Sequence, residues 1–235
     1  MNTSIARIGF VILALIVGVL TFANRSSGSA LAAAPSLVPA PAVDNALASK
    51  PGKETAVFAG GCFWGIQAVY QHVKGVKSAV SGYAGGSVAS PTYEDVSSGT
   101  TGHAESVRVV FDPSKVSYGQ LLQVFFAVAH DPTQLNRQGP DIGTQYRSEI
   151  FYTNAAQKRI ATAYIDQLTN AKTFTRPIVT RASASRSFTV AEDYHQNYAN
   201  EHPNDPYIRF NDAPKVAALK SELAPLYKAD LSSWK

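Results

Sequence analysis

Residues 54–86 read ETAVFAGGCFWGIQAVYQHVKGVKSAVSGYAGG. A short apolar run, residues 56–59, ends in glycines, which is the pattern of a buried strand. Ile66, Val69, Tyr70 and Val73 recur at helical spacing, so a helix is predicted from near Cys62 to residues 74–75. A second strand is predicted at residues 76–83, before two glycines. The stretch therefore predicts a strand–helix–strand unit with Cys62 at the start of its helix.

The same patterns extend to the rest of the domain. The expected segments are a polar loop at 86–102, a strand at 103–111, a helix at 118–129, a long polar loop at 130–146, a strand at 148–152, a helix at 154–170 capped by Asn154, a strand at 177–181, and a mostly helical or irregular last stretch. The order β-α-β-β-α-β predicts an α+β fold, a ferredoxin-like two-layer sandwich with long loops and an irregular, partly helical C-terminal extension.

The N-terminal part has the order of a secretory signal. A basic start is followed by an apolar run at residues 8–23 and by small residues around Ala32. The run is shorter than the roughly 18 residues of a membrane span. We therefore expect a signal peptide at residues 1–32, a flexible Ala/Pro-rich linker at 33–52 and one catalytic domain at 53–235. We interpret the protein as exported to the periplasm, with an uncleaved signal anchor as the alternative.

Composition narrows the class of protein. The net charge of +4 is spread along the chain without a lysine or arginine run, so nucleic-acid binding gains little support. No histidine or cysteine spacing indicates a metal site, and no bound cofactor is expected. We expect a monomer that does not bind the membrane after signal cleavage.

Cys62 is the only cysteine, so it cannot form an internal disulfide. A cysteine in the first turn of a helix faces free backbone N–H groups and the positive end of the helix dipole, which favour the thiolate. An unpaired cysteine in an exported protein indicates that the thiol is used. The alternative is an inert, packed thiol.

Glu105 lies on the predicted strand 103–111, where side chains alternate between faces. It shares a face with Val107, Val109 and Phe111. A carboxylate on an apolar face should have a raised pKa, which makes Glu105 a candidate proton donor. The alternative is a glutamate at the strand end that reaches solvent.

The loop 130–146 is longer than an ordinary connector and ends in polar side chains. It holds Asp141 and Tyr146 close to Arg147, and Tyr93 offers a second phenol on another loop. Each of these residues taken singly is also compatible with a role in packing.

From about residue 55 to 215 the chain resembles peptide methionine sulfoxide reductase A. The resemblance rests on Gly61-Cys62-Phe63-Trp64-Gly65, Gly82-Tyr83-Ala84-Gly85-Gly86, Pro91-Thr92-Tyr93, Thr101-Gly102-His103-Ala104-Glu105, Gln138-Gly139-Pro140-Asp141, Gly143-Thr144-Gln145-Tyr146-Arg147-Ser148 and Ala191-Glu192-Asp193-Tyr194-His195-Gln196.

The resemblance implies a role for each candidate residue. Cys62 would attack the sulfoxide sulfur, and Glu105 would donate a proton to the sulfoxide oxygen. The same likeness assigns the pocket for the S-methyl group to Phe63 and Trp64. Tyr93 and Tyr146 would hydrogen-bond the oxygen, with Asp141 as the acidic member of the loop; the S epimer of the sulfoxide, free or in proteins, would be the substrate.

The sequence departs from many relatives because residues 204–210 contain no cysteine that could resolve a sulfenic acid. An external thiol must then regenerate Cys62. We expect a thioredoxin-like or glutaredoxin-like donor, or a small thiol, as the reductant and partner.

Two other functions stay open at this point. One is an exported Cys-His acyl-transfer hydrolase with His103, His130 or His195 as the base. The other is an exported interaction module with an inert cysteine, which predicts slow alkylation of Cys62 and an ordinary thiol pKa.

Overall fold

The computed structural model describes residues 38–235. Four strands carry the predicted core: β1 (Glu54–Gly60), β2 (Val76–Ala84), β3 (Ala104–Phe111) and β6 (Ser148–Tyr152). They lie side by side in the order β6-β1-β3-β2, and all three pairings are antiparallel. With helices after β1 and β3, this is the order of a ferredoxin-like sandwich, so the predicted fold class is confirmed.

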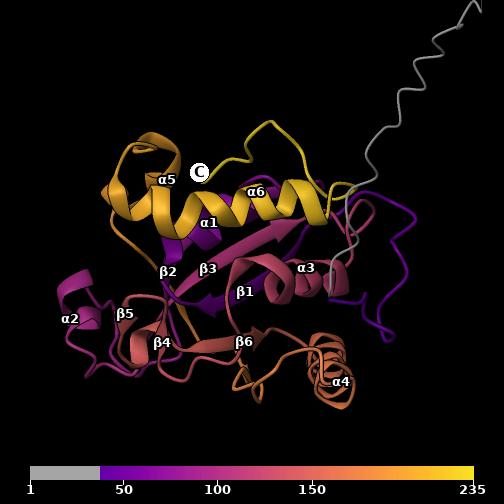
Figure 1. Ribbon diagram of the computed structural model, residues 1–235, viewed down its shortest axis with the longest axis horizontal. Helices are drawn as coiled ribbons and strands as arrows, with labels where there is room; N and C mark the ends of the chain where they lie inside the picture. Colours follow the sequence, from indigo (N-terminus) through magenta and orange to yellow (C-terminus); the bar gives the residue numbers. More distant parts are fainter. Residues whose placement is uncertain (1–37) are drawn as a thin grey trace, which may run out of the picture. The chain divides into compact units, whose positions relative to one another are not determined.

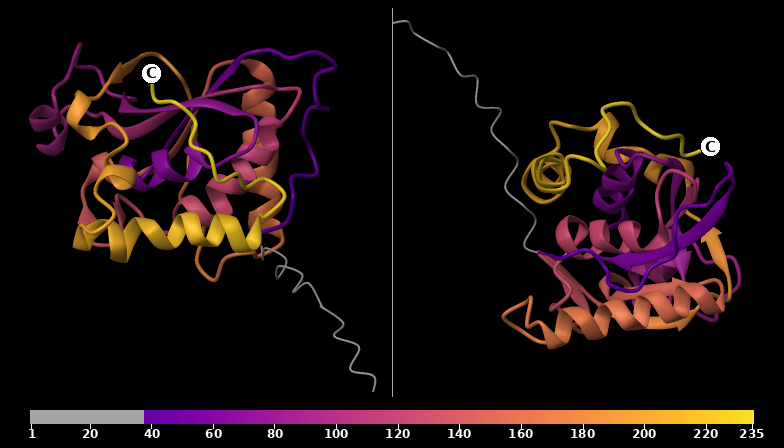
Figure 2. Two further views of the ribbon diagram at one scale, coloured as in Figure 1. Left: turned by 90° about the horizontal axis from the view of Figure 1, so that it is seen from above. Right: turned by 90° about the vertical axis from the view of Figure 1, so that its right-hand side faces the viewer.

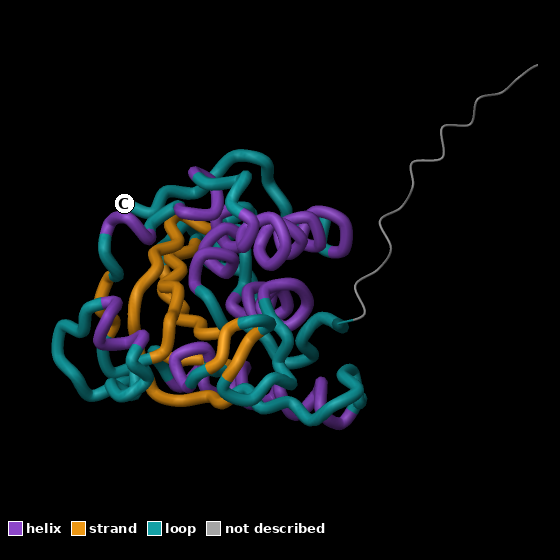
Figure 3. The backbone as a smooth tube through the Cα atoms, turned by 60° about the vertical axis from the view of Figure 1, so that its left-hand side comes forward, coloured by secondary structure: helices purple, strands orange, loops and turns teal. Residues whose placement is uncertain are grey.

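Helices cover one face of this sheet, as Figures 1 and 3 show. They are α1 (Phe63–Gln71), α3 (Tyr118–Val124), which continues as a π-helical turn (Phe125–Ala129), and α4 (Ala155–Asn170). Phe58 of β1 stacks between the rings of Tyr70 and Phe125, with centroids at 5.1 and 5.2 Å. Asn154 caps α4 as predicted, because its side chain accepts a hydrogen bond from the backbone N–H of Gln157.

Shorter elements build the loops and the C-terminal part. They are α2 (Tyr93–Ser97), the hairpin β4 (Arg137–Gln138) and β5 (Asp141–Ile142), a 3-10 turn (Thr144–Tyr146), a second 3-10 turn (Asp193–His195), α5 (Tyr198–Glu201), a second π-helical turn (Ile208–Asp212) and α6 (Ala213–Glu222). Helix α6 lies along α1 on the outside, in yellow in Figures 1 and 2. The C-terminal extension is thus helical in part, as expected.

Two edge strands differ from the sequence prediction. The strand expected at 177–181 is found at β7 (Arg181–Ala184), parallel to β6, because the backbone N–H of Val179 donates to the carbonyl of Pro132 instead of to the sheet. The strand β8 (Phe188–Val190) pairs with β2 in a stretch expected to be helical or irregular. The sheet therefore has six strands, in the order β7-β6-β1-β3-β2-β8.

Residues 38–52 differ from the flexible linker that their composition predicts. The hydroxyl of Tyr164 donates to the carbonyl of Pro39 at 2.6 Å, and Gln167 bonds the backbone of Ala40 and Ala42. The carboxylate of Asp44 accepts from the backbone N–H of Gly119 at 3.0 Å. This segment is therefore attached to the helical layer. The predicted signal peptide and residues 33–37 lie outside the described residues, and the described part contains no helix long and apolar enough to cross a membrane.

Candidate functional site

Cys62 stands between β1 and α1, and it is the N-cap of the helix. The preceding Gly61 has φ +98°, a conformation that glycine adopts without strain and that turns the chain from strand to helix. The Cys62 side chain makes no capping hydrogen bond to the first turn of α1. Cys62 is 7% exposed. The predicted position at the helix start is thus confirmed, but the thiol is largely buried.

Burial changes the expected ionisation of Cys62. Desolvation is the largest influence and raises the pKa of the thiol well above its ordinary value, and the nearby carboxylates Glu105 and Asp212 raise it further. The Trp64 N–H and the ammonium of Lys215 act in the opposite direction with smaller effect. The prediction of a thiolate favoured by the helix start is therefore wrong for the free protein, because desolvation outweighs the dipole. Slow alkylation would consequently not distinguish an inert cysteine from a catalytic one.

Glu105 reaches the same helix start from β3. Its side chain is 3% exposed and shares a face with Val107, Val109 and Phe111, as the alternation predicts. The Oε2 atom accepts a hydrogen bond of 3.0 Å from the backbone N–H of Phe63. Burial raises the pKa of this carboxyl to about 8, although the Phe63 N–H lowers it. The predicted rise is confirmed, and Glu105 is a neutral acid at pH 7 beside Cys62.

The two loop phenols and Asp141 share one electrostatic environment with Glu105. Burial raises the pKa of Tyr146, and Glu105 and Asp141 raise it further, followed by Tyr93 and Cys62. Burial also raises the pKa of Tyr93, with added effects of Glu105, Cys62 and Asp141. The fold thus brings the five predicted polar site residues together, although they come from five different elements. They are Glu105 of β3, Tyr93 of α2, Asp141 of β5, Tyr146 of the turn before β6 and Cys62 at the start of α1.

The aromatic residues after Cys62 belong to a ring cluster. Phe63 is buried against the rings of Tyr83 and His195, with centroids at 5.9 and 5.1 Å. Trp64 is half-buried, stacks on Tyr198 at 3.9 Å, and donates from Nε1 to Nδ1 of His195. The cluster forms an aromatic wall next to Cys62.

Several residues around the site were missed from the sequence. The hydroxyl of Tyr207 donates to Asp141, and its ring meets Trp64 edge-on at 6.0 Å. Glu192 accepts from the backbone N–H of Tyr93 at 2.9 Å and from the hydroxyl of Tyr83 at 2.8 Å. Glu192 lies in a quoted motif, so the signal was present, whereas Tyr207 lies in a segment judged only by its missing cysteine.

The glycines around Cys62 make room for side chains of the protein itself. A Cβ atom at Gly61 would lie 2.5 Å from the side chain of Gln138, and one at Gly65 would lie 2.1 Å from Oδ1 of Asp212. Both distances are shorter than any normal contact, so a side chain at either position would displace its neighbour.

The three histidines proposed as hydrolase bases have other partners. Nε2 of His103 contacts the carbonyl of Val88 at 2.8 Å. His130 bonds the Phe125 carbonyl and Ser148, and burial lowers its pKa to about 4. His195 accepts from Trp64. Within residues 38–235 none of them hydrogen-bonds Cys62, so the geometry of a Cys-His pair is not present there.

Comparison with known proteins identifies the family. The family model for peptide methionine sulfoxide reductase matches residues 54–226. The chain belongs to this family. Curated relatives include the peptide methionine sulfoxide reductase MsrA 2 of Mesorhizobium japonicum, 61% identical over 75% of this chain and 91% of that protein, and MsrA of Deinococcus radiodurans, 51% identical over 75% and 86%.

Solved structures agree with the assignment to peptide methionine sulfoxide reductase A. Methionine sulfoxide reductase A of Corynebacterium diphtheriae is 35% identical and covers 74% of this chain and 88% of its own, with a TM-score of 0.56. The reduced form of Mxr1 from Saccharomyces cerevisiae is 29% identical over 68% and 94%, with a TM-score of 0.59. The protein is a thiol-dependent oxidoreductase that reduces methionine sulfoxide. This membership favours the reductase over both other functions.

Proposed function

We propose that Cys62 is the nucleophile of this reductase and Glu105 its proton donor. The observation that carries the proposal is the 3.0 Å hydrogen bond between Glu105 and the backbone N–H of Phe63, which holds a buried acid at the turn that Cys62 caps. The Cys62 sulfur attacks the sulfoxide sulfur while Glu105 protonates the oxygen. The thiol proton and the Glu105 proton both end on this oxygen, the sulfur–oxygen bond breaks, and water leaves from the new sulfur–sulfur adduct. Water then attacks the Cys62 sulfur, the sulfur–sulfur bond breaks, methionine leaves, and Cys62 becomes a sulfenic acid while Glu105 regains its proton. The sulfoxide gains the two electrons that Cys62 loses.

The protonation states support this division of work. A sulfoxide oxygen is a poor leaving group unless it is protonated, so the acid must be neutral at the working pH. A pKa of about 8 keeps Glu105 neutral at pH 7. The thiol proton must leave Cys62 as the sulfur attacks, and the Trp64 N–H stabilises the negative charge that then develops.

The other candidate residues surround the reacting groups. In the proposed complex Tyr93 and Tyr146 donate hydrogen bonds to the sulfoxide oxygen, and Phe63 and Trp64 contact the S-methyl group. Asp141, which accepts from Tyr207, orders the loop that carries Tyr146. The S epimer, free or within oxidised proteins, is the substrate that the family likeness favours.

The second half of the cycle needs a partner because the chain has a single cysteine. Two external thiol groups reduce the sulfenic acid: they form a disulfide, release water and restore the Cys62 thiol. We propose a thioredoxin-like or glutaredoxin-like protein, or a small thiol, as the donor. No bound cofactor takes part in this scheme.

We further propose that the protein repairs oxidised methionine outside the cytoplasm, as a monomer in the periplasm. The signal-like order of residues 1–32 supports export.

The experiment that tests the function uses the full chain, a methionine sulfoxide peptide and dithiothreitol. The wild-type protein should form methionine continuously, and Cys62→Ser should form none. Equal activity of the two proteins would remove Cys62 from the reaction. Covalent acylation by a thioester without sulfoxide turnover would instead support the hydrolase.

A further inference from the structure

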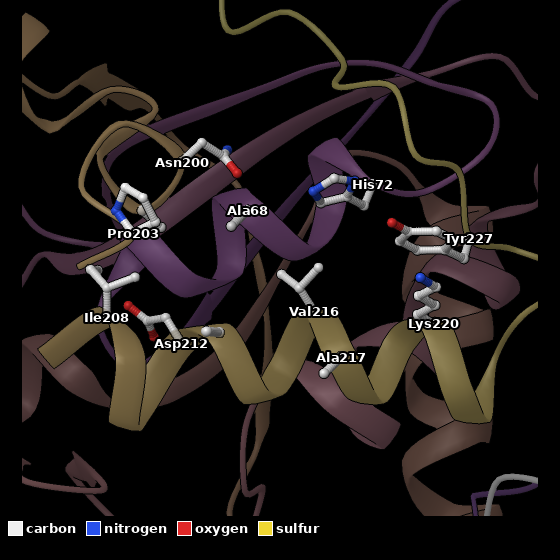
Figure 4. Close-up of a pocket in the computed structure, with 12 residues that line it drawn as sticks. Ala68, His72, Asn200, Pro203, Ile208, Asp212, Val216, Ala217, Lys220 and Tyr227 are labelled. Atoms are coloured by element: carbon white, nitrogen blue, oxygen red, sulfur yellow. The ribbon is translucent and has the colours of Figure 1, made fainter. Parts of the chain in front are cut away.

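A buried ion pair outside the assigned site lies against the helix that Cys62 caps. Asp212 ends the second π-helical turn, and Lys215 follows on α6. Their Oδ1 and Nζ atoms are 3.0 Å apart, and the side chains are 0% and 17% exposed. Figure 4 shows Asp212 extending from the start of α6 toward α1, at one end of a cavity of about 380 Å³ between the two helices.

The contact with α1 is close because Gly65 has no side chain. A Cβ atom at Gly65 would lie 2.1 Å from Oδ1 of Asp212 and 2.9 Å from Nζ of Lys215. Both charged groups therefore occupy the space beside the first turn of α1. On this turn the Phe63 N–H donates to Glu105, and the Trp64 N–H lowers the pKa of the Cys62 thiol, so three consecutive residues face charged or reacting groups.

A contribution to folding stability does not by itself explain why the Asp212–Lys215 ion pair is present. The Oδ2 atom of Asp212 is buried without a hydrogen-bond partner among the described residues. Leaving a carboxylate oxygen unpaired is unfavourable, and buried ion pairs are often replaceable by apolar side chains without loss of stability.

The charges of Asp212 and Lys215 both shift the pKa of the Cys62 thiol. The charged groups that act on the Cys62 thiol are Glu105 from β3 and Asp212 and Lys215 from the C-terminal helices. The titratable hydroxyls that interact with it are those of Tyr93, Tyr146, Tyr198 and Tyr207. Glu105 and Asp212 raise the pKa of the thiol, whereas Lys215 lowers it. The Lys215 ammonium is only slightly exposed, because it lies 3.0 Å from the fully buried Asp212 carboxylate.

We infer that Lys215 is a positioning residue for the reductase, whose ammonium, held by Asp212, supplies the counter-charge for the Cys62 sulfur as it becomes a thiolate. Lys215 does not touch the substrate in this scheme; it acts through Cys62. The inference rests on the proposed role of Cys62 as the nucleophile.

The test measures alkylation of the full chain by iodoacetamide as a function of pH. Cys62 is the only cysteine, so the rate reports on this thiol alone. Lys215→Met should move the profile to higher pH and slow the reaction about tenfold at a fixed pH below the thiol pKa, because only the thiolate reacts. Lys215→Arg should retain the wild-type profile. Asp212→Asn should move it to lower pH.

Lys220→Met is the matched control. Lys220 is exposed on the same helix, and its Nζ lies 5.8 Å from the Tyr227 ring centroid, away from Asp212. Its profile should equal that of the wild type. A Lys215→Met profile that coincides with that of the wild type would overturn the inference. If Lys215→Met does not fold, Lys215→Gln, which also removes the charge, decides in its place.

Failure of this inference can be told apart from failure of the proposed function. Alkylation is measured without sulfoxide or turnover, whereas the function depends on the loss of methionine formation in Cys62→Ser. Opposite shifts in the two variants would support the charge effect even if Cys62→Ser proved active.

Discussion

The carboxylate of Glu105 accepts a hydrogen bond of 3.0 Å from the backbone N–H of Phe63, the first residue of the helix that Cys62 caps. This bond joins the middle of the sheet to the turn that carries the thiol. It places a buried acid and a buried sulfur at one helix end, where the charge of Glu105 raises the cost of ionising Cys62. The relationship leads to predictions for activity and for stability.

Two substitutions of Glu105 should distinguish its role as a proton donor from its contribution to packing. Glu105→Gln keeps the shape and a neutral donor, so we expect it to retain part of the rate. Glu105→Ala should lose about two to four orders of magnitude in kcat/KM, the usual range for a general acid. Steady-state assays with a methionine sulfoxide peptide measure both. Equal activity of wild type, glutamine and alanine variants would exclude the acid role.

Glu105 should also give stability a characteristic pH dependence. Its pKa in the folded protein, about 8, lies above the ordinary value of 4.5, so the folded state binds the proton more tightly. The associated stability is present below about pH 4.5 and is lost as the pH rises through 8. The free energy of unfolding should therefore fall by roughly 4–5 kcal/mol relative to Glu105→Gln across this interval. Urea denaturation at several pH values measures the difference; parallel curves would refute the raised pKa.

Tyr207 should contribute to activity although it lies outside the sequence motifs that resemble the family. Its hydroxyl donates to Asp141. Tyr207→Phe removes this bond to a charged group, worth about 1.5–3 kcal/mol, and should lower kcat/KM roughly tenfold or more. Tyr198→Phe is the control, because the Tyr198 ring also contacts Trp64 but its hydroxyl donates to Asp205 at 3.3 Å. A loss of equal size in both variants would indicate general packing damage.

Gly65 tests the close approach of Asp212 to α1. Alanine is favoured over glycine in a helix by about 1 kcal/mol, so propensity alone predicts stabilisation. The short contact with Asp212 should reverse the sign, and Gly65→Ala should destabilise by about 1–3 kcal/mol. Gly52→Ala is the control, since its Cβ would meet Pro113 only at 3.4 Å. Stabilisation by Gly65→Ala in thermal unfolding would show that the pair moves away at little cost.

Asp44 tests whether residues 38–52 contribute to the domain. Its carboxylate accepts from the backbone N–H of Gly119 and from the hydroxyl of Ser117, at the start of α3. Asp44→Ala should destabilise by about 1–2 kcal/mol, whereas the exposed Lys50→Ala should change little. Chemical denaturation measures both, and equal midpoints would favour the flexible linker that composition predicts.

Sequence patterns predicted the parts of the fold that are determined locally. The strand–helix–strand unit at 54–86 was found because glycines and apolar spacing act within a few residues. Alternation along β3 placed Glu105 on the apolar face, and Asn154 marked the start of α4. These features depend on neighbours in the chain.

The remaining features depend on partners far away in the sequence. Strand β8 is three residues long and is stabilised by pairing with β2, and Pro39 is held by Tyr164, 125 residues later. The pKa of Cys62 was predicted from the helix start alone, whereas burial by the whole fold dominates it, followed by the charges of Glu105 and Asp212. No local pattern distinguishes Lys215, which faces the site, from Lys220 on the same helix.

The most direct test of the central claim is a single-turnover measurement without added thiol. Full-length enzyme is mixed with excess methionine sulfoxide peptide, and methionine and the oxidation state of Cys62 are quantified together. The account predicts at most one methionine per chain, with a sulfenic acid trapped on Cys62 in equal amount. Methionine formed by Cys62→Ser, or two methionines per wild-type chain, would contradict it.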